Sequence, residues 1–131
     1  MSSGAHPYLE VGKLVAWHAS LDEALGEAAA SKKRVLVIHG RATCGGTRAL
    51  VEKTIAKEEI AEFLNAHFVG MAGDADHPDP ALAEIISRLP RQAPTPLCIY
   101  LDPDRRVVHS TAGGRPPAVF LNDLTDAMMK K

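Results

Sequence analysis

The sequence predicts an α/β fold in which a central mixed β-sheet is covered by helices on both faces. Short apolar runs rich in β-branched residues alternate with helical patterns, the order expected of strands joined by crossover helices. Near the C-terminus, two apolar runs are separated only by a turn at residues 102–105, which predicts an antiparallel hairpin. With 131 residues, the chain is long enough to bury the core of one domain spanning 1–131.

Composition excludes several classes of function. The net charge of −1 gives no electrostatic reason to expect binding to nucleic acid or to an anionic membrane. No apolar run approaches the roughly 20 residues that a membrane-spanning helix needs. Residues 1–12 are expected to form a loose lead-in without the pattern of a signal peptide. The sequence as given therefore predicts a cytoplasmic protein, or a periplasmic or secreted one if a leader has been removed.

The elements before the first buried strand are an expected edge strand at 13–18 and a helix at 21–31. Ser20 is a candidate N-cap for that helix, and Glu23 completes a capping box three residues later. The basic run at 32–34 suits the negative end of the same helix, or else forms a solvated turn.

The next elements follow the buried strand predicted at 35–38. A loop at 39–43 leads to a helix that is expected to run from Cys44 to about residue 57. The remaining elements are expected to be a helix at 58–66, a strand at 67–72, a loop at 73–80, a helix at 81–89, a proline-rich extended segment at 90–96, strands at 97–101 and 106–110, a loop at 113–117 and a closing helix at 117–129.

Cys44 is the strongest candidate for a chemical site. It lies between the end of a strand and the start of a helix, where unpaired backbone N–H groups and the helix dipole favour an anion. A thiol in such a position ionises more easily. Thr47, one turn further on, can point its hydroxyl at the sulfur. Arg41 and Arg48 flank the site and would add positive potential there, or else are ordinary surface charges.

Other residues with reactive side chains have simpler interpretations. Cys98 lies in a buried strand and is expected to be a small core hydrophobe, since a resolving role requires that it face Cys44. His39 could serve as a base but is better explained as a packed histidine, and Asp74 and Asp76 as solvated loop residues. No metal site is predicted, because the cysteines and histidines lack recognisable ligand spacing.

Four segments in this order resemble the thioredoxin-like superfamily: WHASLDEALGEAAASKKRVLVIHG, ATCGGTRAL, EEIAEFLNAHFVG and APTPLCIYLDPDRRVV. The resemblance covers residues 14 to 129 and implies a three-layer thioredoxin-like fold. It further implies a cis peptide bond between Thr95 and Pro96 beside Cys44, with the backbone of Thr95 pairing with an extended substrate. Thr43, Gly45 and Gly46 are placed at the same substrate site.

Departures from the family pattern are as informative as the match. Thr47 replaces the second cysteine of the Cys-x-x-Cys motif, so a disulfide within the motif cannot form. Thr43 replaces the usual tryptophan, and Ile38 stands where the family has a buried acid that shuttles protons. The resemblance therefore implies an atypical member without general dithiol reductase activity.

Three functions remain open for this site. Cys44 could form mixed disulfides with a protein or peptide substrate, resolved by an external thiol such as glutathione as co-substrate. It could reduce peroxides through a sulfenic acid, since Cys44-Gly45-x-Thr47 also resembles the glutathione peroxidases, although equivalents of their glutamine and tryptophan-asparagine segments are absent. The domain could instead be a non-catalytic binding or chaperone-like module. No bound cofactor is expected, and the protein is predicted to be a monomer or a weak dimer.

Overall fold

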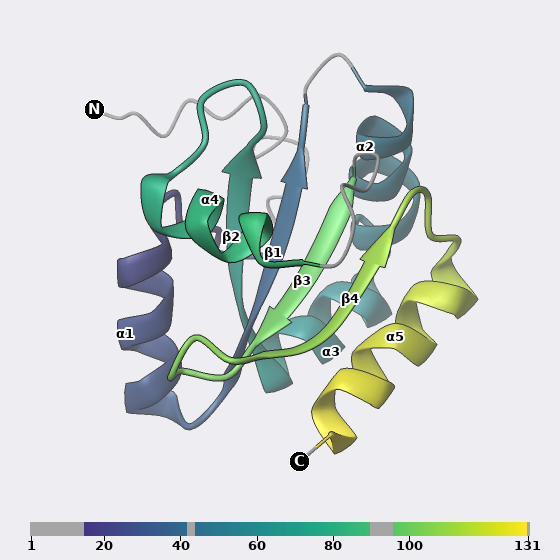
Figure 1. Ribbon diagram of the computed structural model, residues 1–131. Coiled ribbons are helices and arrows are strands. Elements are labelled where there is room, and N and C mark those ends of the chain that lie inside the picture. The colour runs from purple at the N-terminus through teal and green to yellow at the C-terminus, as the bar shows by residue number, and fades with distance from the viewer. Residues whose placement is uncertain (1–14, 42–43, 90–95, 131) are drawn as a thin grey trace.

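A computed structural model describes residues 15–41, 44–89 and 96–130 (Figure 1). The elements alternate between helix and strand in the predicted manner. In chain order they are α1 (Leu21–Ser31), β1 (Arg34–Gly40), α2 (Gly45–Ala49), the π-helix η1 (Leu50–Ile55), α3 (Glu58–His67), β2 (Phe68–Asp74), α4 (Pro80–Ser87), β3 (Leu97–Leu101), β4 (Val107–Ala112) and α5 (Pro117–Met129).

The four strands form one mixed sheet in the order β2-β1-β3-β4. β1 runs parallel to β2 and antiparallel to β3, and β3 pairs with β4 as the predicted antiparallel hairpin. The expectation that strands separated by helices are parallel is therefore wrong for β3. Helix α4 has eight residues and spans about 12 Å, whereas the seven residues of β2 span about 23 Å. The helix alone does not span the sheet, and β3 starts at the end where β2 finishes, since Asp74 pairs with Gly40 and Leu97 with the adjacent His39.

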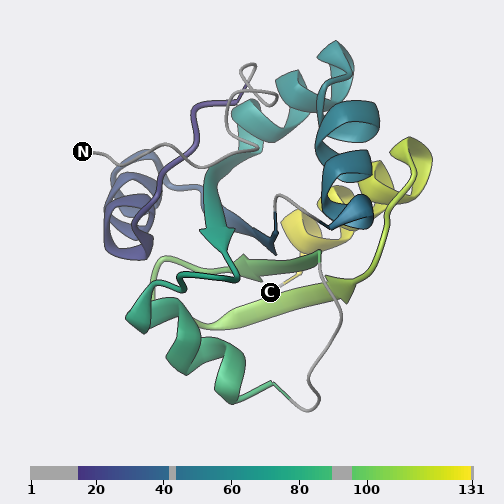
Figure 2. The same cartoon turned by 90° about the horizontal axis from the view of Figure 1, so that it is seen from above.

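Helices cover both faces of the sheet, as the sequence predicts (Figure 2). α1 and α4 pack on one face with Val35 and Val37, whereas η1, α3 and α5 pack on the other with Leu36 and Ile38. All four of these β1 side chains are fully buried. A strand buried on both faces needs apolar residues at consecutive positions, which explains why β1 is continuously apolar.

The predicted edge strand at 13–18 is wrong in its described part, which begins at Val15. Only His18 pairs with the sheet, through a single parallel bridge to Met71. Trp17 packs on the outermost strand β2: its ring lies 2.8 Å from where a Cβ on Gly70 would be.

The helix after Cys44 begins where it was predicted, but its second half is a π-helix rather than an α-helix. Such turns are uncommon and are often found next to functional sites. The Thr54 hydroxyl in η1 donates a hydrogen bond of 2.8 Å to the Arg115 carbonyl, which ties η1 to the loop before α5. The helix ends at Ile55, and α3 starts at Glu58.

Helix boundaries marked by capping residues agree with the sequence. Ser20 caps α1 by accepting a hydrogen bond of 3.3 Å from the Glu23 amide. α1, β3 and α5 have the predicted bounds, while β2 extends two residues further, to Asp74.

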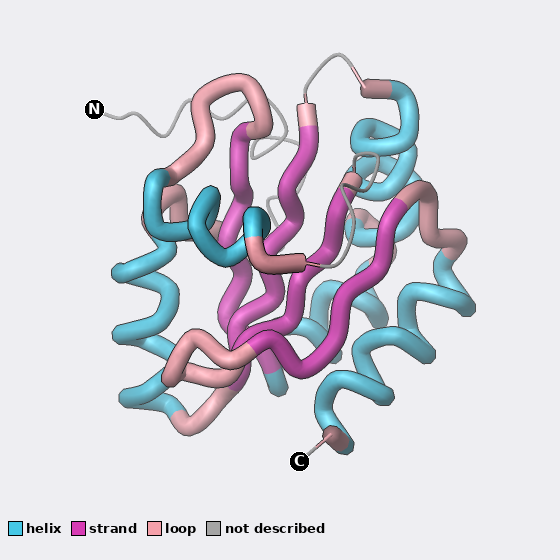
Figure 3. Tube along the Cα trace, in the orientation of Figure 1, coloured by secondary structure: helices cyan, strands magenta, loops and turns pink. Residues whose placement is uncertain are grey.

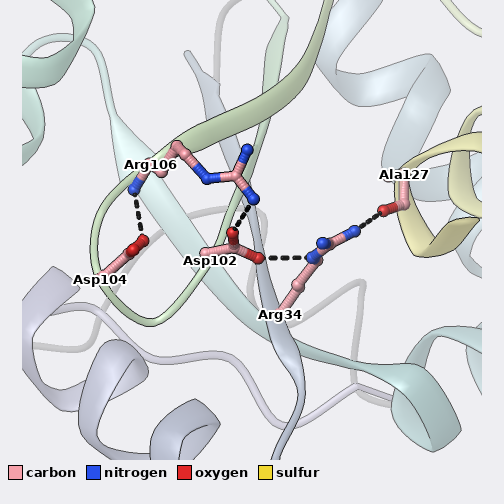
Figure 4. Close-up of polar contacts among 5 residues, drawn as sticks. All are labelled: Arg34, Asp102, Asp104, Arg106 and Ala127. Carbon is pink, nitrogen blue, oxygen red and sulfur yellow. Dashed lines mark hydrogen bonds and ion pairs between the residues drawn. The ribbon is translucent and has the colours of Figure 1, made fainter. Parts of the chain in front are cut away.

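The basic run at 32–34 does not have the role that the sequence suggests. Lys33 donates 2.8 Å to the Asn65 carbonyl near the end of α3. Arg34 donates to the Ala127 carbonyl near the end of α5 and binds Asp102 at 2.6 Å (Figure 4). The side chains of Lys33 and Arg34 therefore interact with the negative C-terminal ends of α3 and α5 instead of α1.

Candidate functional site

Cys44 occupies the N-cap position of α2, as predicted. Its backbone is extended, with φ −83° and ψ 121°. The Cys44 amide donates a hydrogen bond of 3.1 Å to the Arg41 carbonyl, and the Cys44 carbonyl accepts a hydrogen bond of 3.0 Å from the Arg48 amide. The residue is half-buried and is not in a disulfide. The thiol-bearing residue is thus held at the start of a helix, where backbone N–H groups lack intrahelical partners.

Thr47 is completely buried and holds the loop onto the end of β1. Its Oγ1 accepts a hydrogen bond of 3.3 Å from the Arg41 amide. A Cβ on Gly40 would lie 2.5 Å from this oxygen and 2.6 Å from the Thr47 methyl group. Only glycine at position 40 allows this contact, which is a feature that the sequence analysis missed.

Arg41 connects the Cys44 loop to the loop that follows β2. Its Nε binds Asp76 Oδ1 at 2.9 Å, and the Ala75 amide donates 2.9 Å to the Gly40 carbonyl. The segments after β1 and β2 leave the sheet at the same end (Figure 3), because Gly40 and Asp74 are paired in register. The interpretation of Asp76 as a merely solvated loop residue is therefore wrong. The parallel pairing of these strands is the signal that could have placed it near Cys44.

The loop after β2 is also ordered from within. Asp74 Oδ1 accepts 2.9 Å from the Asp76 amide, and Asp74 Oδ2 lies 3.4 Å from His77 Nδ1. Asp74 thereby fixes the backbone of the loop that presents Asp76 to Arg41.

Arg48, the other flanking cation, pairs with Glu52 one turn along the helix at 3.3 Å. Both side chains are largely exposed, as in an ordinary surface ion pair. Gly45 is also exposed, and nothing lies within 4 Å of where its Cβ would be. Gly45 and Gly46 form the first turn of α2 next to Cys44.

His39 lies on the opposite face of the sheet from α2. It follows Val35 and Val37 in the alternation of β1, and its Nδ1 lies 3.2 Å from where a Cβ on Gly73 would be. Burial and then the charge of Arg41 lower the pKa of His39, while Asp74 opposes this shift. Its position and neutral character fit a packed histidine rather than a base for Cys44.

Cys98 is fully buried and faces the core, in register with Ile38 on β1 and Thr111 on β4. Burial raises the pKa of the Cys98 thiol to about 12. The thiol is thus protonated and inaccessible at neutral pH, in accordance with the expected core role.

Pro96 lies at the same end of the sheet as Cys44. It comes immediately before β3, whose first residue, Leu97, is paired with His39 near the end of β1. The Pro96 carbonyl accepts 2.9 Å from the Gly113 amide, and Gly113 has φ +87°, which favours glycine. Thr43, Thr95 and the peptide bond before Pro96 lie outside the described residues.

A pocket of about 410 Å³ flanks the same helix and was not predicted. It lies between α2–η1 and the loop before α5, and its lining consists of Ala49, Leu50, Lys53, Thr54, Gly114, Arg115, Pro116 and Pro117. Arg115 is held by Asp123 through contacts of 2.7 and 2.9 Å, and these hydrogen bonds raise the pKa of Arg115.

Within the described part of the chain, no helix combines the length and the apolar character needed to cross a membrane. Over the same residues, no three His, Cys, Asp or Glu side chains are grouped closely enough to hold a metal ion.

The mixed sheet, the helices on both faces and a cysteine at the start of α2 define a thioredoxin-like protein. Residues 16–103 match the model of a family described as thioredoxin-like. This match spans most of the chain, and the chain belongs to that family. None of the curated proteins matches it.

Solved structures show the same fold. A thioredoxin from Thermus thermophilus has a TM-score of 0.72 and 24% identity, with 88% of each chain covered. The DsbH oxidoreductase has a TM-score of 0.69 and 15% identity, covering 87% of this chain and 84% of the other. A disulphide isomerase from Xylella fastidiosa Temecula1 has a TM-score of 0.59 and 20% identity, covering 98% and 90%. At these identities the similarity is one of fold.

Proposed function

We propose that this protein is a monothiol oxidoreductase in which Cys44 forms mixed disulfides. The observation that carries the proposal is a half-buried thiol at the start of α2 without a second usable thiol in the chain. The sequence has two cysteines, and the other one, Cys98, is fully buried with a raised pKa. A cysteine so placed can attack a disulfide, but no thiol of the same chain can finish the reaction.

The reaction that follows needs two thiols from outside the domain. The Cys44 thiolate attacks a disulfide of a protein or peptide substrate, forming a mixed disulfide and releasing one substrate sulfur as a thiolate. A first external thiol, for which we propose glutathione, then attacks the Cys44 sulfur of the mixed disulfide, displaces the second substrate sulfur as a thiolate and leaves glutathione bound to Cys44. A second glutathione attacks the glutathione sulfur of this adduct, which forms oxidised glutathione and releases the Cys44 thiolate. The protons lost by the two glutathione thiols are taken up by the two substrate thiolates. One disulfide is exchanged for another at each step, so no additional oxidant is required.

Each candidate residue has a proposed role in this reaction. Thr47 accepts from the Arg41 amide, so its hydroxyl proton remains for donation to the Cys44 thiolate. Amides of Gly45 and Gly46 face the charge at the start of the helix. We assign the binding of an extended substrate to Thr43, Thr95 and Pro96, of which only Pro96 lies within the described residues, and we assign a contribution of positive potential to Arg41 and Arg48.

The pH dependence of Cys44 alkylation tests the proposal. We expect a midpoint below that of a free thiol, ~8.5, and a glutathione adduct on Cys44 detectable by mass spectrometry after treatment with oxidised glutathione. Cys98→Ala, which leaves Cys44 as the only thiol, should retain both properties, whereas Cys44→Ser should lose both. A midpoint at or above that of a free thiol would exclude an activated cysteine.

A non-catalytic binding module is the second candidate. It is favoured by Thr47, which is completely buried and serves to attach the loop to Gly40 and Arg41. Under this alternative, Cys44→Ser would capture partner proteins as well as the wild type does. Peroxidase activity predicts instead a sulfenic acid on Cys44, measurable as a mass increase of one oxygen after exposure to hydrogen peroxide.

A further inference from the structure

The proposed reaction gives a role to Arg41 but none to Asp76, the carboxylate that binds it. Arg41 lies three residues before Cys44, and its carbonyl oxygen accepts a hydrogen bond of 3.1 Å from the Cys44 amide. Its guanidinium is about half exposed, and its Nε binds Asp76 Oδ1 at 2.9 Å. Asp76 comes from a different strand and is held in place by Asp74. The pair therefore places one positive and one negative charge beside the loop that carries the thiol.

Among the described residues, the other charged or titratable groups near the site are paired or lie on the other face of the sheet. Arg48 pairs with Glu52, Asp74 lies against His77, and His39 is on the other face of the sheet. The charge of Arg41 nevertheless acts at this end of β1, since it lowers the pKa of His39. A substitution of Arg41 or Asp76 is therefore the direct way to change the electrostatic potential at Cys44.

We propose that Asp76 is a positioning residue that sets the reactivity of Cys44 by binding and neutralising Arg41. This inference rests on the proposed function, because it assumes that the Cys44 thiolate is the reacting species. The carboxylate holds the guanidinium toward the loop after β2 and reduces the positive potential at the sulfur. The thiolate of Cys44 is therefore stabilised less by the neutral Arg41–Asp76 pair than it would be by an unpaired arginine.

The proposal makes a prediction that a purely structural ion pair does not make. Asp76→Asn and Arg41→Gln break the same contact, so a structural role predicts changes in the same direction. An electrostatic role predicts opposite changes, because one variant leaves an uncompensated positive charge and the other an uncompensated negative charge. The double variant should return close to the wild type.

The experiment measures alkylation of Cys44 in a Cys98→Ala background with two probes, neutral iodoacetamide and anionic iodoacetate. The ratio of the two rate constants, taken at a pH where the thiol is fully ionised, reports the potential at the sulfur independently of the thiolate fraction. We expect Asp76→Asn to raise the iodoacetate-to-iodoacetamide ratio about two- to fivefold and Arg41→Gln to lower it similarly. The iodoacetamide midpoint should fall for Asp76→Asn and rise for Arg41→Gln.

The matched control is the Arg105–Asp22 pair, which joins the turn between β3 and β4 to α1 on the opposite face of the sheet from η1. It joins distant segments at 2.7 Å, and its arginine has the same exposure as Arg41, 48%. Asp22→Asn and Arg105→Gln make the same charge changes far from Cys44 and should leave the probe ratio unchanged. Asp76→Glu, which keeps the charge, should stay near the wild type.

Changes of the same sign in Asp76→Asn and Arg41→Gln, or changes no larger than those of the control pair, would overturn the proposal. The proposed function fails separately, when the wild-type midpoint lies at or above that of a free thiol. In that case the opposite shifts of the two variants can still be measured around the observed midpoint.

Discussion

Two ends of the same sheet use arginine–aspartate contacts in different ways. At the start of β1, Arg34 and Asp102 are 18% and 16% exposed, and Asp102 also accepts from Arg106. At the end of β1, Arg41 and Asp76 are 48% and 52% exposed and form a single contact. The first cluster joins β1 to the β3–β4 turn and to α5, whereas the second lies beside the thiol. The difference indicates that the first end contributes more to stability, whereas the second is the end at which we propose that the reaction takes place.

The energetic basis of this difference is solvent exposure. A charge that is largely removed from water must keep its partners, since breaking a buried pair leaves an uncompensated charge. An exposed pair is screened by water and salt and contributes little to folding. A change in either charge of such a pair can nevertheless shift the pKa of a neighbouring ionisable group.

The largest expected effect is the contrast in stability between Arg34→Ala and Arg41→Ala. Arg34→Ala removes the bonds to Asp102 and to the Ala127 carbonyl and should cost about 2–3 kcal/mol of unfolding free energy. Arg41→Ala should cost under about 1 kcal/mol. Equilibrium denaturation in urea measures both. Equal losses would contradict the division of the sheet into a stabilising end and a reactive end.

A second prediction concerns the contact between Gly40 and Thr47. Gly40→Ala places a methyl group 2.5–2.6 Å from the Thr47 side chain, and overpacking of this kind costs about 1–3 kcal/mol. Because Thr47 lies in the first turn after Cys44, the alkylation rate of Cys44 should change as well. Denaturation and alkylation of the same variant check both effects.

Gly45→Ala is the control for this substitution, since nothing lies within 4 Å of the added methyl group. It should leave stability nearly unchanged. Adding Thr47→Ala to Gly40→Ala removes the clashing atoms and should recover part of the loss, because contacting residues are not additive. A loss unaffected by Thr47→Ala would show that the strain arises elsewhere.

The smallest expected effect is the dependence of stability on acid pH. Partial burial raises the pKa of Asp102, but hydrogen bonds from Arg34 and Arg106 outweigh burial, so the net pKa lies below its ordinary 3.8. The contribution of Asp102 is therefore fully present above pH 3.8 and is lost as the pH falls through the folded-state pKa. Urea denaturation at several pH values should show a weaker acid dependence for Asp102→Asn. An identical dependence in the wild type and the variant would contradict the role of this cluster.

Much of the fold could be predicted because local signals mark its elements. Ser20 caps α1, proline begins α5, and the turn at 102–105 separates β3 from β4. Cys44 could be placed at a helix start for the same reason, since a buried apolar strand ends just before it. These predictions depend on residues that are neighbours in the sequence.

The features of the fold that the sequence did not predict depend on contacts between segments that are far apart in the sequence. The antiparallel direction of β3 is seen only in its pairing with β1, and the π-helix η1 has no local signature. Lys33 and Arg34 cap helices that start about 25 and more than 80 residues later. Asp76 was assigned to solvent because nothing near it in the sequence points to Arg41.

The sequence by itself determined the thioredoxin-like class, the alternation of elements and a single candidate cysteine at the start of a helix, since apolar patterning and capping act over a few residues. Only the tertiary structure decided that Thr47 packs on Gly40 and that Asp76 binds Arg41. The physical reason is that parallel pairing of β1 with β2 brings two loops together at one end of the sheet, and charges interact through space rather than along the chain.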